Sequence, residues 1–402
     1  MDDQARSMTM ASRQAPALSV ILLGFDQPAS LDAVLSCLQA QSLRERIEIV
    51  IVVPRDRSFP LDPWRLEGFH RVQVHRSEPI TAIGPAYAAG IRAATAPIVA
   101  LAEDHCFPEP AWAEALLAAY RPEVAAVGPC LRNANPGNAV SWADMLLAYG
   151  PWLAPAAAGE VPFLPGHNSS YRRSILLAYG EALDGLIDQE TVLHWDLRRR
   201  GHRLWLEPKA VAAHTNFGTL IPWLPVQFRC GRRFAAARAG REAWSLARRL
   251  LYGLAAPLIP AVRFQRLQRQ LAGRPATASP LPRGSRVMAA LGLVVDALGQ
   301  GLGYVGGSGR DDGGFLEAET GRPRWLGSSG IPAALKTTRP GCRSAEASPT
   351  DAGRAAAWQG PQERSGPPGH PEPKPALKQP GPAGSAEGLE RPNGLERPGP
   401  SC

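Results

Sequence analysis

The sequence predicts an α/β protein whose mostly parallel sheet is covered by helices on both faces. Short apolar runs rich in β-branched residues, such as 18–23 and 47–53, have the length and composition of buried strands. Segments with apolar residues at helical spacing, such as 30–39 and 86–94, alternate with these runs. This alternation is typical of a parallel sheet buried on both faces, in which ligands bind beyond the carboxyl ends of the strands.

The other elements continue this alternation along the first half of the chain. We expect strands at 18–23, 47–53, 72–75, 98–101, 203–206 and 211–214, the last two around a turn at Pro208. We expect helices at 30–39, 86–94, 109–120 and 190–200, and a strand or loop followed by a helix within 169–179. Three groups of residues directly follow strands and are candidates for ligand binding: Gly24, Phe25 and Asp26; Pro54, Arg55 and Asp56; and Glu103, Asp104 and His105.

Composition divides the 402-residue chain into unequal parts. Proline is dense near the C-terminus, and such sequence buries too little apolar surface to offset its ordering entropy, so we expect a disordered tail over 307–402. We expect a flexible N-terminus at 1–16, a sheet-containing domain at 17–222 and a helical segment at 223–306. The beginning of the chain has no apolar leader, and none of the six cysteines forms a CxxC pair. A secretory signal and a zinc cluster are therefore not expected, and a reduced cytoplasmic compartment is.

The segment 223–306 is basic and partly apolar. Between residues 196 and 286 there are 17 Arg and one Lys against three acidic residues. The apolar run 250–262 is too short to span a bilayer, and the run 287–305 contains Asp296 and Gln300. We expect interfacial or re-entrant elements peripheral to the inner face of the cell membrane. The alternative is a basic amphipathic extension packed on the domain itself.

The strongest chemical motif is the segment 98–112, IVALAEDHCFPEPAW. An apolar strand ends in Glu103, Asp104 and His105, and a helix follows the prolines. Carboxylate and imidazole groups at the end of a parallel strand can hold a divalent cation, which in turn neutralises a diphosphate. The alternative is a solvated acidic loop.

This segment resembles the metal-binding DxD region of glycosyltransferase family 2, whose members have the Rossmann-like GT-A fold. Glu103 and His105 then occupy the two DxD positions. The resemblance implies a divalent metal, Mn²⁺ or Mg²⁺, bound by Glu103, His105 and His214, and imidazole favours softer ions such as Mn²⁺.

Other segments are similar to the family in the same order. The resemblance implies that these residues bind a nucleotide-sugar: Phe25, Asp26, Asp56, Glu103, Asp104 and Asn168. Counting back from Gly201 places Glu190 at the catalytic base, with Asp188 as a rival for that role. Taken alone, Glu190 is better explained as a charge that favours a helix N-terminus, and His214 as a structural histidine.

The resemblance implies an inverting transfer of sugar from a nucleotide donor, a UDP-sugar, to an acceptor hydroxyl. The acceptor would be a glycan or a lipid-linked molecule in polysaccharide or glycolipid assembly, at a membrane surface. An inactive GT-A-like scaffold protein at the membrane is the alternative, because Pro54, Arg55 and Tyr87 replace residues usual in the family. We do not expect nucleic acid as a partner, because no pattern of stacking aromatic residues or helix-turn-helix motif accompanies the basic segment.

Overall fold

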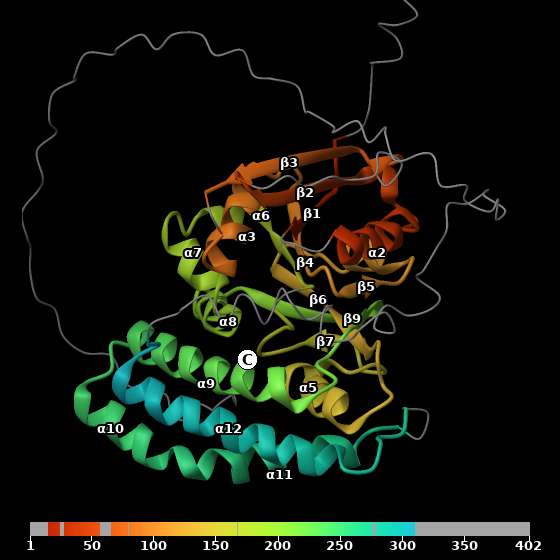
Figure 1. Cartoon of the computed structure of the whole chain (residues 1–402). Coiled ribbons are helices and arrows are strands. Elements are labelled where there is room, and N and C mark those ends of the chain that lie inside the picture. The colour runs from red at the N-terminus through yellow and green to blue at the C-terminus, as the bar shows by residue number, and fades with distance from the viewer. Residues whose placement is uncertain are drawn as a thin grey trace, which may run out of the picture.

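The computed structural model describes residues 15–24, 28–56, 66–78, 80–166, 168–275 and 279–309. Within these residues, a sheet with helices on both sides lies above a layer of long helices (Figure 1). The strands are β1 Leu18–Leu23, β2 Ile47–Pro54, β3 Arg71–Ser77, β4 Ile98–Ala102, β5 Cys106–Pro108, β6 Val124–Asn133, β7 Gly159–Glu160, β8 Ser170–Arg172 and β9 Arg203–His214. The α-helices are α2 Pro28–Gln39, α3 Ile83–Ala93, α4 Trp112–Ala118, α5 Ala139–Tyr149, α6 Arg173–Leu177, α7 Ala182–Ile187, α8 Glu190–Arg199, α9 Leu220–Arg241, α10 Leu246–Ala255, α11 Ile259–Ala272 and α12 Ser285–Gly306. Short 3₁₀ turns are η1 Arg44–Arg46, η3 Gly150–Trp152 and η4 Ala256–Leu258.

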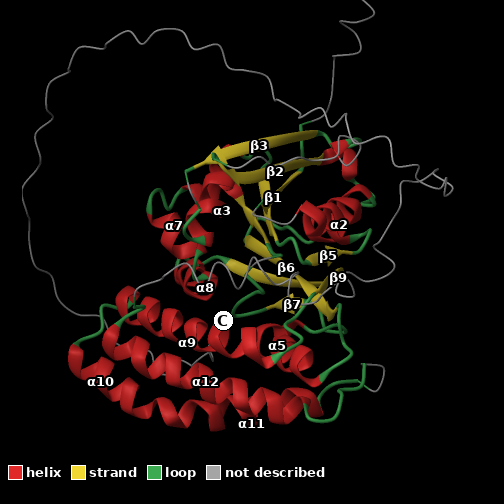
Figure 2. Cartoon of the chain, in the orientation of Figure 1, coloured by secondary structure: helices red, strands yellow, loops and turns green. Residues whose placement is uncertain are grey.

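The sheet is mixed, and its longer strands pair in parallel. Its strand order is β3-β2-β1-β4-β8-β6-β9-β5, and β7 pairs with β9 off this path. Figure 2 shows the strands in yellow and the helices in red. The parallel pairs join β1 to β2 and β4, β2 to β3, and β6 to β9. The short strands β5, β7 and β8 pair antiparallel with their neighbours. This architecture confirms the predicted fold class, and it brings the carboxyl ends of β4 and β9 to the same edge.

The two faces of the sheet are buried against different helices, as the apolar runs predict. Along β1, Leu18, Val20 and Leu22 pack into a core with helices that include α2, α4 and α5. Ile21 and Leu23 point the other way, into a core with α3, α6, α7 and α8. A strand buried on both faces has no solvent-exposed side, which explains its largely apolar sequence.

The structure differs from the sequence-based expectation at several elements. The predicted strands 203–206 and 211–214 form one strand, β9, because its partner β6 stays paired across a bulge. The register shifts there, from Pro129 opposite Glu207 to Cys130 opposite Val211, so the expected turn at Pro208 is a bulge. In addition, β6 and α5 were not expected, although both are largely buried.

The lower layer is built around α12, which packs against α9, α5, α10 and α11. Helix α12 is the one described helix long and apolar enough to cross a membrane, and half of its most apolar stretch is buried inside the protein. Its contact with α9 depends on glycine. A Cβ at Gly299 would clash with the Phe228 carbonyl oxygen, and one at Gly303 would clash with the Arg232 carbonyl oxygen. The two helix backbones therefore approach closely.

Replacing Gly299 by Ala tests this contact. The added methyl group must push α9 and α12 apart, so we expect Gly299→Ala to lower the free energy of unfolding by about 1–3 kcal/mol. Gly306→Ala is the matched control, because no atom lies within 4 Å of its added Cβ. Alanine is the better helix former, so the control should be neutral or stabilising by up to about 1 kcal/mol. Equal denaturant midpoints for the two variants would contradict the close contact.

Candidate active site

Two strand ends that are far apart in the sequence meet at one edge of the sheet. Only three residues, Glu103, Asp104 and His105, connect β4 to β5. Strand β5 pairs antiparallel with the end of β9, with Cys106 opposite His214. The Thr215 amide also donates a hydrogen bond of 3.0 Å to the His105 carbonyl oxygen. This pairing places both histidines beside the end of β4.

Glu103 is held by Asn168. The Asn168 side-chain amide donates to Glu103 Oε2 at 2.8 Å, and Asn168 Oδ1 lies 3.4 Å from the Glu103 amide. Asn168 is buried and has φ 73°, a left-handed conformation that asparagine tolerates better than most residues. The structure therefore places the amide predicted to bind a nucleotide-sugar against the predicted metal ligand.

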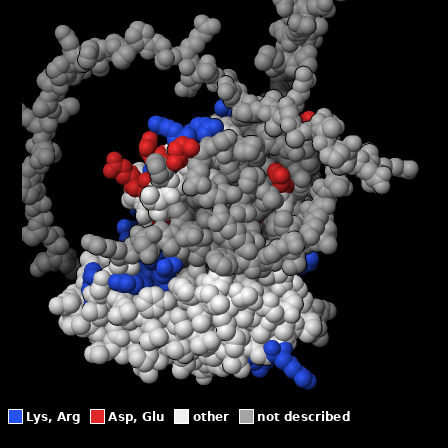
Figure 3. Space-filling view, viewed as in Figure 1, with Lys and Arg blue, Asp and Glu red and all other residues white. Residues whose placement is uncertain are grey.

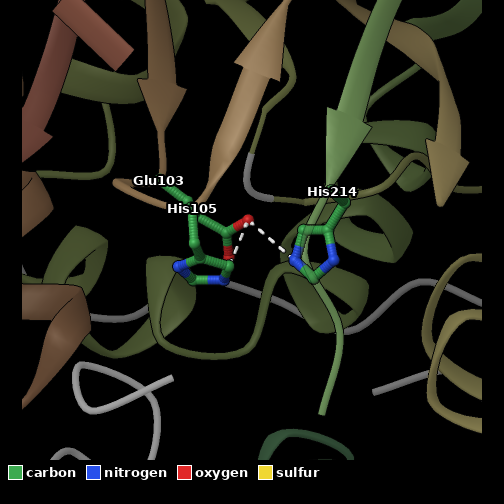
Figure 4. Close-up of side chains that lie close together, drawn as sticks. All are labelled: Glu103, His105 and His214. Carbon is green, nitrogen blue, oxygen red and sulfur yellow. Dashed lines mark ion pairs between the residues drawn. The ribbon is translucent and has the colours of Figure 1, made fainter. Parts of the chain in front are cut away.

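Both histidines present the same nitrogen to Glu103. His105 Nδ1 lies 2.8 Å from Asp104 Oδ1, and His214 Nδ1 lies 3.0 Å from Asn216 Oδ1. Because these oxygens accept hydrogen bonds, each Nδ1 carries the proton in the neutral ring, and each Nε2 carries a lone pair. The two Nε2 atoms lie 3.8 and 3.4 Å from Glu103 Oε2 (Figure 4).

Asn216 was not expected from the sequence, and hydrogen bonds with two other asparagines fix its orientation. Its side-chain nitrogen donates to Asn133 Oδ1 at 3.0 Å, and its backbone amide donates to Asn135 Oδ1 at 2.8 Å. The Tyr149 hydroxyl, from the end of α5, lies 3.1 Å from His214 Nε2. Such outer partners set the tautomer and the basicity of metal-binding histidines. An asparagine two residues after a strand-end histidine is a weak signal without the neighbouring loop.

The donor set fits a divalent cation. One ligand atom from each of Glu103, His105 and His214 can be chosen so that all lie within 4.8 Å of one another. The side chains are nearly buried, with 10%, 6% and 0% of their surface exposed. One carboxylate oxygen and two imidazole lone pairs converge, which is a ligand set that Mn²⁺ accepts more readily than Mg²⁺.

Glu190 lies at the start of α8, against the loop that carries Asn168. A Cβ at Gly166 would clash with Glu190 Cγ, so glycine at 166 leaves the space that Glu190 occupies. The hydroxyl of Tyr87 donates to the Ala102 carbonyl oxygen at 2.9 Å. Burial raises the pKa of Tyr87 well above its usual value, and the carboxylates of Glu103, Asp104 and Glu190 raise it further. A neutral phenol thus lies within electrostatic reach of all three carboxylates.

Asp188, the rival for the base role, is tied to other elements. Its carboxylate accepts a hydrogen bond of 3.3 Å from the Gly84 amide at the N-terminus of α3. It also forms an ion pair with Arg233 of α9. A carboxylate at a helix N-terminus is stabilised by the helix dipole, so these contacts join α3, α9 and the turn before α8.

The remaining predicted residues lie apart or outside the described part of the chain. Asp56 lies on the exposed turn after β2, at the edge where β4 ends. Strand β1 separates β2 from β4, which puts Asp56 about 10 Å from the Glu103 strand. Phe25 and Asp26 lie outside the described residues, as do residues 1–14 of the predicted N-terminal segment and residues 310–402 of the predicted tail.

A buried histidine supports the loop around Gly166. His194 Nε2 lies 2.9 Å from the Tyr171 hydroxyl, which donates to the Gly166 carbonyl oxygen at 3.2 Å. The Leu164 amide donates to His194 Nδ1, so the proton of the neutral ring is on Nε2. Burial lowers the pKa of His194 from 6.5 to about 3.

This depressed pKa predicts a loss of stability in acid. Between pH 6.5 and about 3 the unfolded chain binds a proton at His194 that the folded protein does not. The free energy of unfolding should therefore fall with falling pH in this window, by up to about 1.4 kcal/mol per pH unit from this group. His194→Gln removes the titrating group and should flatten the pH dependence of denaturant unfolding, although it lowers stability at neutral pH. An unchanged slope in the variant would refute the assignment.

Comparison with known proteins finds one family model that matches part of the chain. Residues 19–180 match the model of the family described as glycosyl transferase family 2. No curated protein matches the sequence. Similar solved structures include GalNAc-T7 with UDP, GalNAc and Mn²⁺, at 14% identity and TM-score 0.40, covering 58% of this chain and 52% of that one. They also include the mannosyltransferase PcManGT from Pyrobaculum calidifontis in complex with GDP-Man and Mn²⁺, at 16% identity and TM-score 0.45, covering 74% of this chain and 92% of that one.

The chain thus spans about half of the GalNAc-T7 structure. The matched segment includes β1 to β8 and carries Glu103, Asp104, His105 and Asn168 of the site. The part of the chain that matches glycosyl transferase family 2 is thus residues 19–180.

Proposed function

We propose that the protein transfers a sugar, with inversion, from a nucleotide-sugar to an acceptor hydroxyl. The observation that carries this proposal is the convergence of Glu103, His105 and His214 at the edge of the sheet, with Glu190 nearby. In open α/β sheets this edge is where ligands bind. We also propose that residues 17–222 act as the GT-A domain, and that 223–306 form a membrane-facing segment that begins within α9.

The metal end of the site would receive the donor diphosphate. Glu103, His105 and His214 would hold Mn²⁺ or Mg²⁺, which would neutralise the charge of the leaving nucleoside diphosphate. Asp104 and Asn168 would contribute by orienting His105 and Glu103. Phe25, Asp26 and Asp56 remain our proposal for the nucleotide contacts. The donor is proposed to be a UDP-sugar.

Glu190 would act as the general base. Glu190 lies against Gly166, two residues before Asn168, which binds Glu103. The charge of Glu190 acts on the Tyr87 hydroxyl, as do the charges of Glu103 and Asp104. A carboxylate there can take the proton from the acceptor hydroxyl as its oxygen attacks the anomeric carbon. Attack on the face opposite the diphosphate inverts the configuration. Asp188 is less suited to this role, because its carboxylate already pairs with Arg233.

The acceptor would be a glycan or a lipid-linked molecule used in polysaccharide or glycolipid assembly. Only five residues separate His214 from the first residue of α9, so the proposed metal site lies close in the chain to the helical layer. We propose that the enzyme works in the cytoplasm, peripheral to the inner face of the cell membrane.

Substitutions of Glu190 and Asp188 test which of the two carboxylates acts as the base and which has a structural role. Glu190→Gln should lower kcat by about 10²–10⁴ while the donor dissociation constant and the melting temperature stay near wild type. Asp188→Asn weakens the contacts with Arg233 and α3, so it should lower the melting temperature as well as activity. Transfer can be measured as release of nucleoside diphosphate with a panel of donors. Full activity in Glu190→Gln would exclude this base.

Metal-dependent donor binding tests the other half of the site. Calorimetry with UDP-sugars and GDP-sugars should show binding that Mn²⁺ strengthens, and His105→Ala should reduce the affinity for Mn²⁺ by at least about 100-fold. His202→Ala is the control, because His202 directly precedes the opposite end of β9. It should bind metal and donor like wild type. Failure of the folded wild type to bind any donor would instead favour a catalytically inactive GT-A-like scaffold protein.

A further inference from the structure

The helical layer exposes large apolar side chains, and the rest of the described chain exposes none of this kind. Every large hydrophobic residue with an exposed side chain in the described part lies between residues 220 and 305. Five of them lie along α10 and η4: Leu246, Leu250, Leu251, Leu254 and Leu258. Leu254 is 81% exposed and Leu258 is 67% exposed. Contiguous apolar surface of this kind marks an interaction site.

Helix α12 continues this surface with a single stripe. Its exposed apolar residues are Val287, Leu291, Val294, Leu298, Leu302 and Val305. They follow one another at intervals of three or four residues, which places them on one side of the helix. Helices α10 and α11 both pack against α12, so the stripe and the leucines of α10 lie on neighbouring helices. We name the five leucines and this stripe together the apolar face.

The other side of α12 packs against the rest of the protein. Gly292, Gly299 and Gly303 pack against α5 and α9, and Asp296 forms an ion pair of 2.5 Å with Arg263 of α11. Both charged side chains are nearly buried. A helix that spanned a bilayer alone would have to break this ion pair and the contact with α9. The geometry therefore favours a helix that lies along a surface with one side exposed.

The charges around the apolar face indicate which partner it fits. Residues 243–309 contain eight Arg and no Lys, against a single acidic residue, the buried Asp296. In the view of Figure 3 the helical layer shows no acidic side chain, and its basic side chains lie toward the edges. Two copies of this surface would bring arginines against arginines. Anionic headgroups would be attracted to the same arginines.

We propose that the apolar face is a monotopic docking surface for an anionic lipid bilayer, with α10 and α12 lying in the plane of the interface. The leucine and valine side chains enter the boundary between headgroups and acyl chains, and exposed arginines such as Arg266, Arg269 and Arg286 contact the headgroups. This deepens the membrane part of the proposed function and supplies its partner. Docking itself needs neither donor nor acceptor.

Vesicle flotation of the full chain tests the docking surface. Leu254→Asn, Leu298→Asn and Leu302→Asn are combined in one variant, since all three side chains are exposed and contribute little to folding. With vesicles of phosphatidylcholine and phosphatidylglycerol, the triple variant should lose about 100-fold in partitioning, because each leucine contributes a factor of roughly five. The control carries Glu67→Gln, Glu123→Gln and Glu160→Gln in the sheet-containing domain and should float like wild type.

The outcomes separate a lipid-docking surface from a spanning helix and from a contact between two copies of the chain. Wild type should bind phosphatidylglycerol vesicles more tightly than pure phosphatidylcholine vesicles, and alkaline carbonate should extract it. Resistance to carbonate would show a spanning helix and overturn in-plane docking. Wild-type dimers in light scattering that the triple variant converts to monomers, without vesicle binding, would assign the face to a second copy. Donor binding by the triple variant should stay at the wild-type level, so loss of flotation and loss of function are measured independently.

Discussion

The three-residue connection from β4 to β5 is the constraint on which the site depends. Four residue steps from Ala102 to Cys106 span at most about 14 Å, yet β8, β6 and β9 lie between β4 and β5 in the sheet order. The sheet must therefore curl so that the end of β9 returns toward the end of β4. The bulge that inserts Pro208, Lys209 and Ala210 into β9 increases its local bend and twist. Because β5 pairs with β9 and Cys106 lies opposite His214, the three residues that connect β4 to β5 lie beside His214.

The same constraint explains why the candidate ligand atoms converge. Asp104 and Asn216 each accept from an Nδ1 and so turn an Nε2 lone pair toward Glu103. A negative oxygen and two lone pairs in a nearly buried space repel one another unless a cation or proton lies among them. The Asn168 amide and the Asn133–Asn135–Asn216 network hold the side chains in place at the cost of ordering several polar groups. Such an arrangement is characteristic of a preorganised site.

The sequence predicted the sheet well where local pattern decides structure. Strands β1, β2 and β4 are continuous apolar runs, so the residues that follow them could be identified as candidates for ligand binding from the pattern alone. Glu103, His105 and His214 could be grouped through the family resemblance, and the structure brings them together. The amide network could not be predicted, because Asn133 and Asn216 meet only through the parallel pairing of β6 and β9. The role of Asp188 was likewise open, since its partner Arg233 lies 45 residues away on another helix. The expected turn at Pro208 was wrong because proline usually interrupts a strand, whereas a bulge accommodates it here.

Helix α9 connects the two halves of the molecule physically as well as in sequence. Its Arg233 pairs with Asp188, and its Arg241 pairs with Asp196 of α8. The two acidic residues lie before and after Glu190 in the sequence, so α9 holds the chain on both sides of Glu190. Asp196 also accepts from Tyr179 and Arg200, and its pKa is lowered to about 2 because these hydrogen bonds and charges outweigh its desolvation. On its other side, α9 packs along the glycines of α12. Packed helices shift as rigid bodies, and charged contacts of this kind are directional. A change in the position of α12 would therefore move α9 and, through these ion pairs, the start of α8. The helical layer is thus part of the frame that positions Glu190, and the site cannot be understood from the sheet alone.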